Sequence, residues 1–193
     1  MSDNSAYLVL EVPIFTSHKA VAVLVKNVQN LETIKKNLIQ GNREYDYAFI
    51  NAKNIVCMEQ LYSAYYKVMQ SFHYETMKSK SLHTEIIYAL SPFKNIMDCL
   101  NKFGISKQSD ALVVLKIMKT EEANIEYFES ELANIKTVVN GDFVELNDVN
   151  LQTTADIKSI VKNYKCKVDQ TQPESDWGTI TRNLVSIIQL KGL

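Results

Sequence analysis

Apolar residues recur along this chain with two spacings, one typical of strands and the other of helices. Short, β-branched apolar runs predict strands at 7–12, 20–25, 47–50, 111–118 and 143–146. Apolar residues three and four positions apart predict helices at 31–40, 58–72, 83–90, 96–103, 121–135, 154–164 and 177–190. Asn30 and Asn95 are suited to cap the helices that follow them, and Gly41 and Gly104 to end helices.

The interleaved order of these elements predicts the fold class. We expect a single α/β (α+β) domain over residues 1–193, with a small mixed or antiparallel sheet packed against several helices. Polar stretches at 73–81 and 169–176 predict exposed loops. A chain of 193 residues with only 5 Gly and 3 Pro favours long regular elements and excludes a collagen-like or linker-rich protein.

The composition limits which cellular compartment and which kinds of site are expected for this protein. The longest apolar run, 20–25, is far shorter than the ~20 residues that span a bilayer. Residues 2–5 are polar and lack the basic start of a signal peptide, so a soluble intracellular domain is expected. The cysteines at 57, 99 and 166 show no metal-site spacing, and neither do the three histidines. Cys57 and Cys99 are therefore expected to be small core residues.

The net charge of −1 conceals an uneven distribution. Residues 53–107 carry seven lysines against four acids, whereas residues 121–150 carry eight acids and one lysine. This asymmetry predicts two different surfaces, of which the basic one is suited to phosphate. For the acidic segment, an ordinary solvated helix face is the simpler interpretation.

Catalytic motifs are not found in the sequence. Glycines at 41, 104, 141, 178 and 192 cannot form a GxGxxG or GxxxxGK[ST] phosphate loop, and no GxSxG is present. Tyr62, Tyr65 and Tyr66 on one helix are suited to stacking on bases, although such residues more often belong to a core. Composition and spacing alone predict a non-enzymatic globular module of unknown role.

One run of the sequence carries a family resemblance. Residues 83–106 read HTEIIYALSPFKNIMDCLNKFGIS and follow the basic lead-in MKSKSL at 77–82. Together they resemble the kinase-binding small subunit of the KEOPS (EKC) complex, the TPRKB family. KNVQN at 26–30 and FINAKNIV at 49–56 also fit, and the closing IIQLKGL at 187–193 is similar to the fungal branch. The resemblance covers nearly the whole chain and is weakest over 119–175.

The resemblance implies a non-catalytic subunit without a cofactor. The complex places threonylcarbamoyl on the adenosine beside the tRNA anticodon, and the transferase chemistry belongs to another subunit. The subunit is expected to dock on the N-terminal lobe of a small atypical Ser/Thr protein kinase and to meet the transferase and dimerisation subunits indirectly. It is also expected to capture the 3′ CCA tail of tRNA. The nucleus and cytoplasm are the implied locations, with fungal links to telomere maintenance and transcription and no membrane partner.

The basic lead-in and the central motif supply the tRNA-binding candidates. Lys78 and Lys80 lie in a predicted exposed loop and are expected to meet phosphate. Ser91 and Asn95 are expected nearby as polar partners of the tail. Glu85 lies inside the motif and would repel phosphate, so we expect it to cap or orient a neighbour instead.

The last predicted helix supplies the kinase-binding candidates. Its apolar stripe holds Ile180, Leu184, Ile187 and Ile188. Thr181 and Val185 widen this stripe beyond what one contact needs. Because the resemblance names a kinase partner, we predict that it is bound by Thr181, Leu184, Val185 and Ile188. Ordinary packing of the stripe on the domain's own sheet remains the alternative.

A different class of function also stays open. The alternative is a stand-alone enzyme acting on a small acyl or phosphoryl substrate. The two classes differ in whether the purified protein turns over a substrate without partners. Recovery of a small kinase with a transferase subunit from the native organism would favour the binding subunit.

Overall fold

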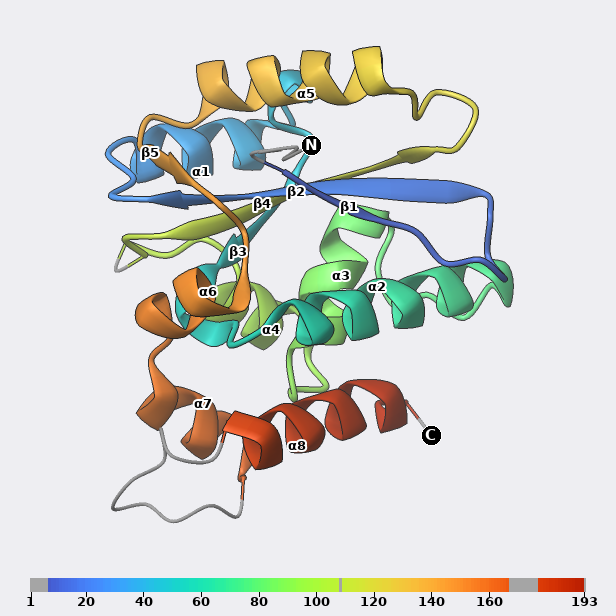
Figure 1. Cartoon of the computed structure of the whole chain (residues 1–193), viewed down its shortest axis with the longest axis vertical. Helices are drawn as coiled ribbons and strands as arrows, with labels where there is room; N and C mark the ends of the chain where they lie inside the picture. The colour runs from blue at the N-terminus through green and yellow to red at the C-terminus, as the bar shows by residue number, and fades with distance from the viewer. Residues whose placement is uncertain (1–6, 108, 167–176, 193) are drawn as a thin grey trace, which may run out of the picture.

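The computed structural model describes residues 7–107, 109–166 and 177–192 (Figure 1). The strands are β1 (Leu8–Leu10), β2 (His18–Lys26), β3 (Ala48–Asn51), β4 (Leu112–Lys119) and β5 (Asp142–Val144). The α-helices are α1 (Leu31–Gln40), α2 (Met58–His73), α3 (Leu82–Leu90), α4 (Ile96–Phe103), α5 (Ile125–Val138), α6 (Asp148–Thr154), α7 (Ile157–Tyr164) and α8 (Trp177–Leu190). Two single-turn 3₁₀-helices, η1 (Arg43–Tyr45) and η2 (Ala52–Asn54), flank β3.

The strands of the described residues form one open antiparallel sheet. β2 and β4 lie side by side at its centre, with Ala22 opposite Leu115. β3 pairs with the other edge of β4, while β1 and β5 pair with successive parts of the outer edge of β2. The predicted fold class, a small sheet packed against several helices, is therefore confirmed, and the sheet is the antiparallel one of the two types expected.

Helices cover both faces of this sheet (Figure 1). Ala22 of β2 belongs to the core under α2, α3 and α4, whereas its neighbour Val23 belongs to the core under α1 and α5. Because both faces are covered, β2 is apolar at nearly every position instead of alternating. α8 forms an outer layer that packs along α2.

Predicted caps and breakers fix several helix ends. The Asn95 side-chain oxygen accepts the backbone N–H of Met97 at 2.8 Å, which confirms Asn95 as the N-cap of α4. Gly41 has a φ of +68°, a left-handed conformation that glycine adopts without steric cost, and it ends α1 as predicted. Gly104 ends α4 for another reason, because a Cβ there would lie 2.5 Å from the carbonyl oxygen of Leu100.

Two predicted helices have the wrong boundaries. The predicted helix 154–164 begins only at Ile157, as α7, and the separate short helix α6 precedes it. Asp156 separates them, because its carboxylate accepts the backbone N–H of Ser159 at 3.1 Å and caps α7. The predicted helix 121–135 begins only at Ile125, because the Asn124 side chain accepts the N–H of Tyr127 and starts α5 there.

Two other expectations concern Asn30 and the predicted loop 169–176. Asn30 precedes α1, but its side chain does not cap that helix. It donates instead to the carbonyl of Val138 at 2.9 Å and accepts the N–H of Asn140 at 3.0 Å, which ties α1 to the end of α5. The predicted loop 169–176 lies outside the described residues.

The tyrosines and cysteines of the helical layers are mainly core residues. Tyr65 on α2 is fully buried, and its hydroxyl donates to the carbonyl of His18 at 2.8 Å. Tyr62, one turn away, keeps some exposed surface. Cys57 and Cys99 are buried, which confirms the interpretation of both as small core side chains.

Candidate functional site

The loop between α2 and α3 presents two of the predicted RNA contacts to solvent. Lys78 and Lys80 are both exposed. Beneath them, the carboxylate of Glu85 is buried, and it accepts the N–H of Lys78 at 3.1 Å on each oxygen and that of Ser79 at 2.7 Å. The expectation that Glu85 orients a neighbour is confirmed. Its charge is directed at the loop's backbone, where it fixes the position of the lysines.

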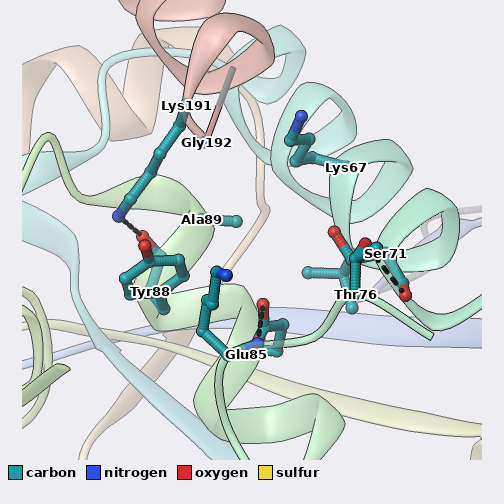
Figure 2. A pocket seen from close by; sticks show the side chains of 10 residues that line it. Lys67, Ser71, Thr76, Glu85, Tyr88, Ala89, Lys191 and Gly192 are labelled. Atoms are coloured by element: carbon teal, nitrogen blue, oxygen red, sulfur yellow. Dashed lines mark hydrogen bonds between the residues drawn. The ribbon is translucent and has the colours of Figure 1, made fainter. Parts of the chain in front are cut away.

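A cavity of about 190 Å³ lies beside this loop (Figure 2). It is lined by α2, the loop itself, α3 and the turn that follows α8. Lys191 and Tyr88 lie on one side of it, and Lys67 and Ser71 lie on the other (Figure 2). With Lys78, three lysines from distant parts of the sequence meet here. We refer to this space as the lysine cavity.

Two of these lysines are held by neutral backbone carbonyls. The Lys191 ammonium donates to the carbonyls of Tyr88 and of Ser91, the latter at 2.8 Å, and it lies 3.4 Å from the centroid of the Tyr88 ring. Lys67 donates to the carbonyl of Gln189 at 3.1 Å. Burial lowers the pKa of Lys191 to about 8, because desolvation penalises its charged form. The cavity therefore brings together three lysines and one carboxylate, Glu85.

We expect the stability of the protein to rise with pH through Lys191. Lysine in the unfolded chain titrates near its ordinary pKa of 10.5, so between about pH 8 and 10 the unfolded state binds more protons than the folded state. From about pH 7.5 to 9, this difference should add up to about 1 kcal/mol to the free energy of unfolding. Urea unfolding of wild type and of Lys191→Met at several pH values separates the contribution of this lysine to the pH dependence of stability from the contributions of thiols and tyrosines. Equal pH slopes for the two proteins would contradict the assignment.

The two predicted polar partners of the tail differ in their exposure. Ser91 is completely buried, and its hydroxyl bonds to the Cys99 sulfur at 3.1 Å and accepts the N–H of Phe93 at 3.0 Å. It holds the turn between α3 and α4 and has no surface to offer to an RNA. Asn95 is exposed, with one oxygen engaged in capping α4. Of the four predicted RNA-binding residues, three therefore have exposed side chains, namely Lys78, Lys80 and Asn95.

The four predicted kinase contacts on α8 divide in the same way. Leu184 and Ile188 have no exposed surface, because they pack into the chain's own core beside α2. The alternative of ordinary packing therefore describes these two residues. Thr181 and Val185 lie at the edge of that contact and are half-buried, and the Thr181 hydroxyl is 3.5 Å from the Cys57 sulfur. Of the four predicted kinase-binding residues, only Thr181 and Val185 therefore keep surface that a kinase could contact.

The side chain of His83, in the central motif, links α3 to β4 and to Asp46 through hydrogen bonds. Its Nε2 accepts the backbone N–H of Ile117 at 3.0 Å, and its Nδ1 lies 2.9 Å from an Asp46 oxygen. Lys116 also contacts Asp46, at 3.1 Å. The hydrogen bond from His83 is the main reason why the pKa of Asp46 lies far below its usual range. The network joins α3 to β4 and supports the start of the motif.

Sequence reasoning missed Lys67 and Lys191 as parts of the cavity. Lys191 belongs to the closing IIQLKGL segment, which contributed to the resemblance, but no local pattern places that segment beside α3. Lys67 lies on the polar side of α2 and has no distinguishing neighbours in the sequence. Only the packing of α8 on α2 brings the two together.

The described part of the chain offers neither a metal-ion cluster nor a membrane-spanning helix. No group of three His, Cys, Asp or Glu side chains is placed to hold a metal ion there. No helix in the same residues is both long and apolar enough to cross a membrane. Cys57, Cys99 and Cys166 are all buried as free thiols.

Comparison with known proteins gives a consistent result. The Schizosaccharomyces pombe EKC/KEOPS complex subunit cgi121 is 34% identical over 181 residues, covering 93% of this chain and 97% of that protein. The subunit of the same name is 34% identical over 168 residues in Debaryomyces hansenii, covering 84% and 85%, and 32% identical over 190 residues in Eremothecium gossypii, covering 96% and 99%. The model of the family described as kinase binding protein CGI-121 matches residues 25–192, which include the whole lysine cavity. The chain therefore belongs to the CGI-121 family of kinase-binding proteins.

Proposed function

We propose that this protein is a non-catalytic subunit of a KEOPS (EKC) complex, where it joins the small atypical kinase to the 3′ CCA tail of tRNA. The names of its fungal relatives support membership of the complex, and the family description supports the kinase. The product of that complex would be threonylcarbamoyladenosine beside the anticodon. The observation that carries the tRNA part is the exposed loop of Lys78 and Lys80, which Glu85 fixes beside the lysine cavity.

The chemistry of this region suits a single-stranded RNA end. Exposed lysines attract phosphate without reading sequence, which fits a tail that is the same on every tRNA. The acids of α5 do not compete strongly, because α5 lies across the sheet from α2 and α3 (Figure 1). Tyr88 and Ala89 give the cavity wall an apolar part that a base or ribose can contact.

The kinase is proposed to bind at the edge of α8, through Thr181 and Val185. From there the protein would meet the transferase and dimerisation subunits only indirectly. As the resemblance to the fungal branch implies, we place it in the nucleus and the cytoplasm and include telomere maintenance and transcription among its roles. The absence of phosphate-loop and nucleophile motifs from the sequence supports a binding role.

Lys78→Glu/Lys80→Glu is expected to weaken binding of CCA-ended tRNA and to leave the fold and kinase binding intact. Each lost phosphate contact should reduce the slope of log affinity against log salt by about one. Filter binding or fluorescence anisotropy at several salt concentrations measures both quantities. Lys136→Glu on α5 is the control, because it reverses an exposed lysine across the sheet from α2 and α3 (Figure 1). Equal tRNA binding by the double variant and this control would show that the RNA contacts lie elsewhere.

A further inference from the structure

A second groove, of about 600 Å³, lies near the start of α2, whereas the lysine cavity lies near the end of that helix. Four lysines line it, namely Lys53, Lys102, Lys107 and Lys162. They come from η2, α4, the segment after α4 and α7. One carboxylate, Asp156, lines it too, and the remaining lining residues carry amide or hydroxyl side chains. The groove is thus basic and polar throughout.

The carboxylate in this groove is already engaged. Asp156 accepts the backbone N–H of Ser159 at 3.1 Å and its hydroxyl at 2.7 Å, as the cap of α7. Lys107 contacts Glu32 at 3.5 Å, but both side chains are more than 80% exposed, and such pairs contribute little free energy. The Lys102 ammonium lies 5.8 Å from the centroid of the Phe93 ring. The contacts of Lys102 and Lys107 are weak enough for a phosphate to replace or join them, whereas Lys53 is paired with Asp110 at 3.2 Å.

The groove connects to the proposed tRNA site through a chain of contacts. Phe93, under Lys102, lies in the turn between α3 and α4, and its N–H donates to the Ser91 hydroxyl. The carbonyl of the same Ser91 accepts from Lys191 of the lysine cavity. Asn95, the exposed residue predicted to contact the tail, ends this turn. The turn between α3 and α4 thus contacts a lysine of each site, Lys191 on one side and Lys102 on the other.

Its lining favours a nucleic-acid backbone over other ligands. An amphipathic peptide would need apolar side chains in the groove, and none lines it. Lysines act as point charges toward phosphate, and side-chain amides both donate to and accept from ribose 2′-hydroxyls. We propose that this groove binds the sugar–phosphate backbone of the tRNA acceptor stem next to the CCA tail. This inference rests on the proposed tRNA-binding function and adds a second contact to it.

The test compares two RNAs, a complete tRNA and the same tRNA without its CCA tail. Lys102→Glu/Lys162→Glu replaces two exposed lysines of the groove and should weaken binding of both RNAs by ~10-fold or more at physiological salt. The salt slope should fall by about two for both. Lys102→Arg/Lys162→Arg keeps the charge and should restore the affinity. Lys78→Glu/Lys80→Glu should matter mainly for the tailed RNA, and Lys136→Glu on α5 should matter for neither.

Several results would overturn the inference. One is a groove variant that binds both RNAs as tightly as the Lys136→Glu control does. Another is a loss confined to the tailed RNA, or a wild-type chain that binds no tail-less RNA even at low salt. Loss of the kinase with unchanged tRNA binding would show that the groove holds a protein. If wild type bound neither RNA, the proposed function itself would fail, which is a different outcome from failure of the groove alone.

Discussion

Leu184→Glu is expected to unfold the protein, whereas Val185→Glu should leave it folded and abolish its binding to the kinase. Leu184 has no exposed surface, and a carboxylate there would be buried without a partner at a cost of several kcal/mol. That is a large part of the 5–15 kcal/mol by which a typical domain is stable. Val185 keeps exposed surface, so its replacement is tolerated until a partner covers it. Thermal unfolding and a pull-down with purified kinase measure the two effects.

Ser186→Glu is the matched control for this experiment. Ser186 is the next residue on α8 and is exposed, so it places the same charge on the same helix away from the proposed contact. It should remain folded and bind the kinase normally. A folded Val185→Glu variant that still binds the kinase would remove α8 from the interface. A Leu184→Glu variant with the wild-type unfolding temperature would contradict the packing of α8 on α2.

Glu85→Ala is expected to weaken tRNA binding although it removes a negative charge from the site. A simple charge argument predicts the opposite. Glu85 accepts the backbone N–H groups of Lys78 and Ser79, and without it these donors lose a charged partner and the loop loses its shape. Hydrogen bonds to charged groups contribute roughly 1.5–3 kcal/mol each, so stability should also fall by about 3 kcal/mol. Chemical unfolding and tRNA affinity at one salt concentration report the two losses.

Glu129→Ala removes the same charge from an exposed position on α5, across the sheet. It should leave tRNA binding unchanged or slightly tighter, because only the long-range charge differs. Glu85→Gln should fall between wild type and Glu85→Ala, because its amide keeps one acceptor oxygen but places an N–H donor against the loop. Tighter tRNA binding by Glu85→Ala would show that the lysine loop does not depend on this carboxylate.

The long helices could be predicted well from the periodic spacing of apolar residues in the sequence. α2 and α8 begin where the spacing of three and four predicts, because many apolar residues define a single buried face in each. α6 was not predicted, because its seven residues are mostly polar and only Leu151 is buried. Its start depends on Asn147, whose side chain accepts the N–H of Asn150, a signal that also occurs in turns.

The candidate site was less predictable, because a pattern shows that a face is covered and does not show what covers it. The stripe of Leu184 and Ile188 fitted a kinase or the domain's own sheet equally well, and in the structure it packs beside α2 instead of on the sheet. Glu85 could be interpreted correctly, because an acid inside a basic motif needs a local partner. Lys67 and Lys191 could not be linked, because their meeting depends on how distant helices pack.

The central strand pair also has a consequence for how this chain folds as it is made. β2 and β4 pair along their lengths, yet about 90 residues separate partners such as Ala22 and Leu115, and pairing over such distances forms slowly. Ribosomes add roughly 5–20 residues per second, so β2 waits roughly 5 to 20 s for β4 to be synthesised. During that time an almost wholly apolar strand lacks its principal partner. Translation speed over residues 27–111, which connect the two strands, therefore sets how long this strand is open to aggregation.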